Sequence, residues 1–492
     1  METTHLKTVD PISQKLLLSA SKRGIELSWE RFEKVQPQDG FLRLGLSCPF
    51  GCMEGPCRID PFGRGPGKGI CGLGKDEMVA GMLLRLCLQG TLEALGSVLS
   101  FDAIPDVQFS AELGKIITPV LSKNGQYDLS ANDIFRSSAM LHRPSCNFRR
   151  LLSQAFRLSL LTLGFLEKNA EQSLSGPVNV TAGYGSVADH TVNIGICGKP
   201  STSFLEATEL ECKQNSGRHA SLVSLGEWIV MNKKYIPVAC TSGEAELLLG
   251  SGVIHLLIAG QGTDPGLVDV CRQTGVPVIT EEELPEPADV VLQAQNYFTT
   301  LSQSILPDDI PALHEDRVVM SSEQFNKVAG TAEGKKLALV GGTDTPQQSL
   351  GQFPVELASS LSEQGLQVVS WGDAALWMIK DSKRNQKKEG APVILEPGQG
   401  PLLTIKARTA AEHLDRLQGI CFTGLKSSKD LAAALGLAYL GERVCVATPV
   451  PLHGSQDVCR VLAEMVEHNH GQFTHFDHSP QPQEILEWFT SF

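Results

Sequence analysis

Short apolar runs alternate with segments of helical periodicity from about residue 185 to residue 492. The runs are rich in β-branched residues and end near Gly or Pro, which is typical of buried strands. Because strand–helix alternation produces parallel sheets covered by helices, we predict an α/β fold for this part of the chain. The predicted strands form two series, at 191–196, 220–225, 236–239, 253–259 and 276–280, and then at 336–340, 367–371, 419–423 and 443–447.

The residues before 185 favour helix instead. Helical patterns cover 12–23, 28–35 and, interrupted by Pro144, 132–166, and Asp76 is a predicted N-cap for an apolar helix that reaches Gly90 or beyond. The charged, Pro-containing stretch 381–400 is a predicted surface loop. We therefore predict an α/β multidomain protein with a helical N-terminal domain (1–184), a Rossmann-like α/β domain (185–334) and a second Rossmann-like α/β domain (335–492).

The net charge of −13 gives the chain no long-range attraction for nucleic acid or for an anionic membrane. The first 20 residues lack the apolar core of a secretory signal, and no apolar run reaches the roughly 18 residues of a membrane span. We expect a cytoplasmic protein. In a reducing compartment its 13 cysteines indicate metal binding or buried packing and not disulfides.

Four of the 13 cysteines lie within residues 48–71, where a uniform spread would place fewer than one. They are Cys48, Cys52, Cys57 and Cys71, and many Gly and Pro residues separate them. Such a loop can wrap a cluster and direct backbone N–H groups at its sulfurs. We predict one [4Fe–4S] cluster on these four thiolates. Zinc is the alternative metal, although zinc sites usually pair two short Cys-x₂₋₄-Cys motifs.

Three motifs resemble the N-terminal region of the anaerobic nickel–iron carbon monoxide dehydrogenase (hybrid-cluster-protein-like) family. They are Gln-Pro-Gln-Asp-Gly-Phe at 36–41, Gly-Pro-Cys-Arg-Ile-Asp-Pro-Phe-Gly at 55–63 and Gly-Ile-Cys-Gly at 69–72. Weaker matches follow in the family's order at 141–143, 193–196, 240–244, 261, 339–341 and 423–424. The resemblance implies one helical and two α/β domains in the order already predicted.

The chain also departs from that resemblance. The family holds a second cubane on two earlier cysteines, and Asp39 and Ser47 stand at those positions here. Its nickel–iron–sulfur cluster is held by one His and five Cys, of which only Cys240 matches. Because one thiolate cannot hold a multinuclear cluster, we expect no nickel. The other ligand positions fall in the loop 197–199 and at Gly262, Gly342, Asp373 and Leu425.

Further positions differ as well. The family's proton-transfer histidines are replaced at Glu93, Ala94 and Ser97, and a lysine near its substrate is replaced around 456–457. Cys197 and Cys240 end predicted neighbouring strands and can face one crevice. Buried packing is the default for the remaining cysteines.

These observations predict a carbon monoxide dehydrogenase-like iron–sulfur protein without a complete nickel–iron–sulfur active site. It would act as an electron-transfer or scaffold subunit of a larger redox complex, with iron–sulfur or flavin protein subunits as partners, and a homodimer is the alternative assembly. Two other functions stay open. One is an oxidoreductase with a different cofactor or small molecule in the altered pocket, and the other is a carbon monoxide dehydrogenase whose ligands lie elsewhere. Whether the chain is itself an enzyme is open.

Overall fold

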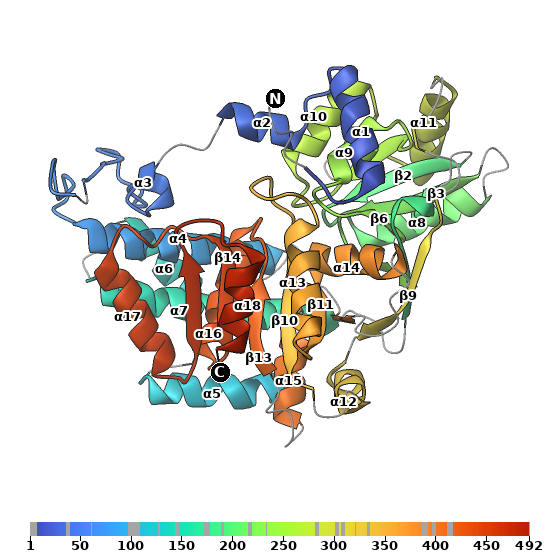
Figure 1. Cartoon of the computed structure of the whole chain (residues 1–492). Helices are drawn as coiled ribbons and strands as arrows, with labels where there is room; N and C mark the ends of the chain where they lie inside the picture. Colours follow the sequence, from blue (N-terminus) through green and yellow to red (C-terminus); the bar gives the residue numbers. More distant parts are fainter. Residues whose placement is uncertain are drawn as a thin grey trace, which may run out of the picture.

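Helices pack on both faces of one long, mixed sheet (Figure 1). The computed structural model describes residues 7–35, 40–60, 62–96, 109–125, 128–142, 147–171, 178–187, 191–214, 219–232, 234–280, 285–300, 305–306, 310–319, 321–331, 335–384, 392–395, 400–410 and 417–491. The loop that carries the four cysteines and the strand ends discussed below lie within these ranges.

Helices precede the first strand of the sheet. In the part of the chain that the structure describes, they are α1 (Pro11–Lys22), α2 (Ser28–Val35), α3 (Gly40–Arg43), α4 (Lys75–Gly96), α5 (Ala111–Lys123), α6 (Asn132–His142) and α7 (Phe148–Glu171). Asp10 caps α1 because its carboxylate accepts the backbone N–H groups of Ile12 and Ser13. The predicted interruption at Pro144 lies outside the described residues, between α6 and α7. Together α4, α7 and α16 (Ser428–Tyr439) form a tightly packed, buried helical layer.

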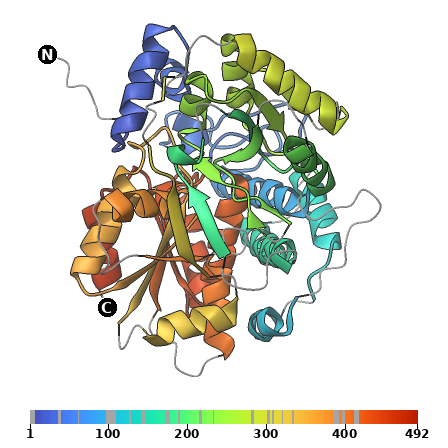
Figure 2. The same cartoon turned by 90° about the vertical axis from the view of Figure 1, so that its right-hand side faces the viewer.

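Thirteen of the described strands form a single sheet. Its order is β15 (Gln472–Phe476), β14 (Arg443–Pro449), β13 (Leu417–Phe422), β10 (Leu337–Gly342), β11 (Gln367–Trp371), β12 (Val393–Leu395), β9 (Leu313–Val319), β1 (Val178–Ala182), β6 (Val238–Cys240), β3 (Ala220–Leu225), β2 (Val192–Cys197), β7 (Leu256–Ala259) and β8 (Val278–Thr280). Neighbouring strands are parallel except for β1 and β9, which are antiparallel. These two strands join the two predicted series, so that the sheet passes without a break from the orange to the green strands in Figure 2.

Within each half of the sheet, the strand order reverses at one point. The order is β6-β3-β2-β7-β8 in one half and β12-β11-β10-β13-β14-β15 in the other. In one half, the chain adds β3 and β6 on one side of β2 and then places β7 on the other side of β2. In the other half, it adds β11 and β12 on one side of β10 and then places β13 on the other side of β10. In doubly wound sheets, ligands bind outside the carboxyl ends of the strands at these points of reversal.

The remaining described helices follow individual strands and cover the two faces of the sheet. They are α8 (Thr202–Gln214), α9 (Ala245–Gly250), α10 (Pro265–Thr274), α11 (Pro287–Thr300), α12 (Ser322–Thr331), α13 (Gln352–Glu363), α14 (Gly372–Arg384), α15 (Leu402–Ala410), α17 (Gln456–Glu467) and α18 (Pro482–Thr490), with a 3₁₀ turn η1 (Tyr184–Ser186) and a small hairpin of β4 (Val230–Met231) and β5 (Lys234–Tyr235).

The predicted mixed α/β class is confirmed, and each predicted strand overlaps an observed one. The strands β1, β9, β12 and β15 are not among those predicted. The prediction of a surface loop at 381–400 is wrong in part, because α14 extends to Arg384 and β12 is buried. The domain boundaries stay predictions, and the boundary at 184 falls after β1, which is already part of the sheet.

Among the residues that the structure describes, one helix, α4, is long and apolar enough to cross a membrane by length and composition. However, 72% of its apolar window is buried inside the protein. Its partners are α7 and α16, so its apolar residues belong to the helical core.

Candidate functional site

The four cysteines predicted to hold a cluster lie on one loop between α3 and α4, the cysteine loop. Cys48, Cys52 and Cys57 are half-buried, Cys71 is exposed, and all four are free of disulfides. The backbone N–H of Ile70 donates to Sγ of Cys57 over 3.5 Å, the kind of contact that stabilises a thiolate or a cluster sulfur. In the described residues no three His, Cys, Asp or Glu side chains converge to hold a metal ion. The four-thiol donor set suits a cubane, and its assignment stays a prediction.

The cysteine loop is anchored on two helices of the N-terminal part. Gly81 of α4 lies against the ring of Phe50, where a Cβ would be only 2.8 Å from the ring. The backbone N–H of Gly51 donates to the carbonyl oxygen of Leu141 in α6 over 3.2 Å. These contacts fix the position of the loop on the helical core, while Cys71 faces outward.

The structure also shows where several residues lie at which the sequence differs from the resembling family. Ser47 begins the cysteine loop, whereas Asp39 and Ser97 lie outside the described residues. Glu93 on α4 forms an ion pair with Lys429 of α16, with 3.1 Å between Oε1 and Nζ. The helix therefore carries an ion pair to α16 where the resemblance implies a histidine.

A glycine lies at or just after the end of each of β10, β11 and β13, and these glycines bring the three strand ends into backbone contact. Gly342 and Gly372 form an isolated parallel bridge, and Gly342 has a φ of +136°. A Cβ at Gly342 would lie 2.7 Å from the carbonyl oxygen of Gly424, and a Cβ at Gly424 would lie 2.1 Å from that of Thr343. Real Cβ atoms essentially never approach a backbone atom this closely. A cysteine at Gly342 therefore does not fit this arrangement unless the strand ends move.

Asp373, which follows β11, is linked by hydrogen bonds to the ends of β6 and β10. Its carboxylate accepts the backbone N–H of Ser242 over 3.0 Å and that of Asp344 over 2.8 Å, together with the hydroxyl of Ser242. Ser242 follows β6 and Asp344 follows β10, and Asp373 is only 3% exposed. At a position where the resemblance implies a cysteine ligand, a carboxylate thus links three strand ends.

Asp344 is the second carboxyl group of this cluster. Its oxygens accept Nε1–H of Trp377 over 2.9 and 3.0 Å. Burial and the nearby charge of Asp373 raise the pKa of Asp344 well above its usual range. Because Asp373 receives three hydrogen bonds, it is the member of the pair that retains the negative charge more readily.

Cys240, the one cysteine that matches a nickel-cluster ligand, ends β6 and is fully buried. Burial and the charge of Glu244 raise its pKa well above the usual range, and Glu244 pairs with Lys380 and accepts the hydroxyl of Ser13 over 2.7 Å. Burial also raises the pKa of Cys197 to about 12. The prediction that Cys197 and Cys240 end neighbouring strands is wrong, because β3 lies between β2 and β6.

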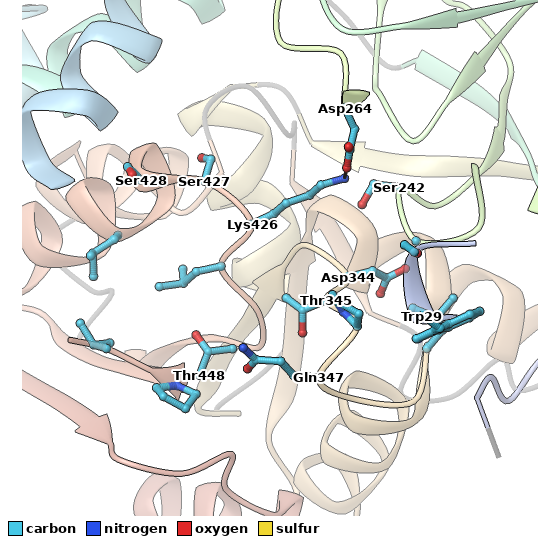
Figure 3. Close-up of a pocket in the computed structure, with 18 of the residues that line it drawn as sticks. Trp29, Ser242, Asp264, Asp344, Thr345, Gln347, Lys426, Ser427, Ser428 and Thr448 are labelled. Atoms are coloured by element: carbon cyan, nitrogen blue, oxygen red, sulfur yellow. Dashed lines mark ion pairs between the residues drawn. The ribbon is translucent and has the colours of Figure 1, made fainter. Parts of the chain in front are cut away.

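A cavity of about 430 Å³ lies beside these strand ends, between α2 and the segments that follow β6, β7, β10, β13 and β14 (Figure 3). Asp264 and Lys426 form an ion pair of 2.9 Å on one side of it. Asp344 and Thr448 also line it, as do apolar side chains, among them Leu86, Leu425, Leu431 and Val450. No motif in the sequence indicates this cavity. The signal in the sequence is weak, since Asp344 is simply a polar residue after one apolar strand and Thr448 a polar residue near the end of another.

Residues 453–475 hold a separate pair of histidines. Nε2 of His453 and Nδ1 of His475 are 3.0 Å apart, and burial followed by the charge of His453 lowers the pKa of His475 to about 4. Asp457, near the position expected for a lysine, is exposed and pairs with Arg460 at the start of α17. Of the other cysteines, Cys146 lies outside the described residues, Cys459 is half-buried, and those at 87, 212, 271, 421 and 445 are buried.

Comparison of the sequence with curated proteins finds carbon monoxide dehydrogenases. Carbon monoxide dehydrogenase 1 of Methanosarcina mazei is 41% identical over 133 residues, which cover 26% of this chain and 21% of the relative. Carbon monoxide dehydrogenase 2 of Carboxydothermus hydrogenoformans is 25% identical over 357 residues, which cover 58% of this chain and 56% of the relative. The matches thus span from about a fifth to just over half of these relatives' length. No family model matches the chain.

Solved structures of the same kind share the fold. Carbon monoxide dehydrogenase IV of Carboxydothermus hydrogenoformans superposes with a TM-score of 0.78 at 17% identity, over 98% of each chain. A nickel-free carbon monoxide dehydrogenase of Thermococcus sp. AM4 gives 0.78 at 19% identity, over 98% of this chain and 96% of the other. At these identities the likeness shows the fold alone.

Proposed function

We propose, on the premise that this chain resembles carbon monoxide dehydrogenases in sequence and in fold, that it is an iron–sulfur protein that transfers electrons within a larger redox complex. Cys48, Cys52, Cys57 and Cys71 would hold one [4Fe–4S] cluster. When bound, such a cluster accepts and returns one electron. No nickel–iron–sulfur cluster forms part of this proposal.

The packing of the strand ends carries the proposal. In the resembling family these ends hold the nickel–iron–sulfur cluster, but here Gly342, Gly372 and Gly424 fill the space with backbone. Asp373 holds the same loops together through hydrogen bonds that a thiolate ligand would not make. Cys240 is the one matching thiol, and burial holds it in its neutral form.

The cysteine loop supports an electron-transfer role. Cys71 is exposed and the backbone N–H of Ile70 is directed at Cys57, so a cluster held there would lie close to the protein surface. In this proposal the chain holds one cluster, so that cluster would exchange electrons with a cofactor on another protein. An iron–sulfur or flavin protein is therefore the partner that the proposal requires.

Metal content and activity test the proposal directly. After anaerobic purification from the native host, we expect about four Fe per chain, which is one cubane. We expect no stoichiometric nickel and no oxidation of carbon monoxide with an artificial electron acceptor, with or without added nickel. Nickel accompanied by excess iron, together with turnover that rises on addition of nickel, would show that the ligands of an active-site cluster lie elsewhere in the chain.

A further inference from the structure

We propose that the cavity at the strand ends binds a small aliphatic amine that also carries a hydroxyl group, that is, an amino alcohol. This inference does not depend on the cluster. It rests on where the cavity lies, on one buried hydroxyl without a partner, on the charges around the cavity, and on its apolar wall.

The position of the cavity is one at which α/β sheets bind ligands. Segments 264–267 and 425–431 follow β7 and β13, the strands at which the order reverses in the two halves of the sheet. The volume of about 430 Å³ is that of a site for a small molecule. Figure 3 shows that polar side chains from several loops point into the same space.

Thr448 supplies the first specific group. Its side chain is buried, with 6% of the residue exposed, and its Oγ1 has no hydrogen-bond partner among the described residues. Thr448 lines the cavity, and Figure 3 shows its side chain next to that of Gln347. Buried hydroxyls are almost always hydrogen-bonded, so this one is available to a polar group of a bound molecule.

The charges around the cavity favour a cation. Glu246 pairs with Arg31 and Asp264 pairs with Lys426, so each of these carboxylates is compensated. Asp344 has no cationic partner in the part of the chain that the structure describes. A protonated amine would stabilise the ionised form of Asp344, which burial otherwise disfavours, whereas an anion would disfavour that form further.

The neighbours of Asp344 reinforce this preference. Its hydrogen bonds come from neutral groups, the Trp377 ring N–H and the Thr241 hydroxyl, and the closest charged group is the carboxylate of Asp373. An ammonium group beside Asp344 would therefore reduce the repulsion between two carboxyl groups. Asp344 is thus the anchor for the amine end.

The remaining wall of the cavity is apolar. Leu86 of α4, Leu431 of α16 and Val450 line it, and Trp29 of α2 closes the side next to Asp344. This surface suits a short alkyl chain between the ammonium and the hydroxyl. A sugar or another polyol would bury hydroxyls against it without partners.

Calorimetry on the full anaerobically purified chain tests the proposal with matched probes. The probes are amino alcohols of three to six carbons, together with the alkylamine and the diol of equal length. We expect saturable binding of at least one amino alcohol. The matching amine should bind several-fold more weakly because it leaves Thr448 without a partner, and the matching diol at least tenfold more weakly because it lacks the charge.

Two variants assign the two ends of the ligand. Asp344→Asn keeps an acceptor for Trp377 and should lower affinity for the amino alcohol at least tenfold while leaving that for the diol unchanged. Thr448→Val should reduce the affinity for the amino alcohol to that for the amine. Asp457→Asn, on the exposed start of α17, is the matched control and should change neither.

Three results would overturn the proposal: no binding of any probe by the folded wild-type chain, equal binding of diol and amino alcohol, or a loss of affinity in Thr448→Val that is equal for the amino alcohol and for the amine. Circular dichroism of each variant separates loss of binding from loss of the fold.

Discussion

At the scale of single residues, Cys57 is the cysteine of the loop whose surroundings most resemble those of a cluster ligand, because it receives the N–H of Ile70. We predict that Cys57→Ser and Cys71→Ser remove or badly degrade the cluster, since a hydroxyl is a poor ligand for this iron. Iron content and the EPR spectrum of the reduced protein measure the loss. Cys459→Ser is the control, because Cys459 lies on α17 and donates to the carbonyl oxygen of Leu452 over 3.4 Å, a role that serine retains. Unchanged iron and EPR spectra in both loop variants would disprove the assignment.

Asp344 leads to a prediction about pH. Burial and the charge of Asp373 raise its pKa in the folded state above the value in the unfolded chain. The unfolded chain therefore loses this proton at lower pH than the folded one, and the free energy of unfolding falls as pH rises from the unfolded pKa through the folded one. Asp344→Asn cannot ionise, so it should be more stable than the wild type at pH 8, with a difference that shrinks toward pH 5.

Urea unfolding in buffer without amines, at several pH values between 5 and 8, measures this difference. Asp457→Asn should show no comparable trend, because Asp457 is exposed. A constant difference between Asp344→Asn and the wild type across this range would mean that the pKa of Asp344 in the folded chain is not raised into this range.

The cysteine loop could be predicted from the sequence, whereas the cavity could not. Cys48 and Cys71 are 23 positions apart on one Gly-rich loop, so their spacing alone carries the signal. The cavity combines Trp29, Asp344 and Thr448, which are more than 100 residues apart along the chain. The missing partner of Thr448 is a fact of three-dimensional packing and leaves no mark in the local sequence.

At the scale of elements, α4 depends on one close contact with α16. A Cβ at Gly90 would lie 2.3 Å from the backbone oxygen of Ser428, so glycine is required where the two helices touch. We predict that Gly90→Ala destabilises the fold by about 1–3 kcal/mol through overpacking. Gly330→Ala on α12 is the matched control, because a Cβ there meets nothing within 4 Å, and it should be neutral or stabilising by up to about 1 kcal/mol.

Thermal and urea unfolding of the two variants compare them with the wild type. Equal stability of Gly90→Ala and Gly330→Ala would mean that α4 and α16 can separate at this point without cost.

The elements that follow a strong local pattern were predictable. The strand at 220–225 has four apolar residues among six, and its observed bounds are those predicted. The strands that were missed owe their position to tertiary pairing. Strand β12 has three residues, 393–395, and lies between β11 and β9, while β9 carries charged residues within its run 313–319. Their place in the sheet follows from their partners and not from their own periodicity.

At the scale of the whole molecule, the net charge and the local charge of the cysteine loop have opposite signs. The chain carries −13, and the sequence alone favours a basic partner surface. The exposed part of the cysteine loop instead presents three basic residues, Arg58, Arg64 and Lys68, against one exposed acidic residue, Glu54. The same surface carries the apolar side chains of Met53, Phe62 and Ile70, which are exposed by 71% or more. A partner that docks here to exchange electrons should therefore offer an acidic rim around an apolar centre.

Native mass spectrometry and association kinetics test this arrangement. We predict that the chain purifies from its host with an iron–sulfur or flavin protein, and that the isolated complex re-forms faster at low salt because opposite charges steer the encounter. Arg64→Glu combined with Lys68→Glu should slow association at least tenfold at low ionic strength without changing iron content. Lys213→Glu, an exposed lysine on α8 in the other part of the molecule, should change neither. A stable isolated monomer or homodimer with no redox protein bound would rule out an electron-transfer subunit and favour a self-contained binding protein or enzyme, with the cavity as its site.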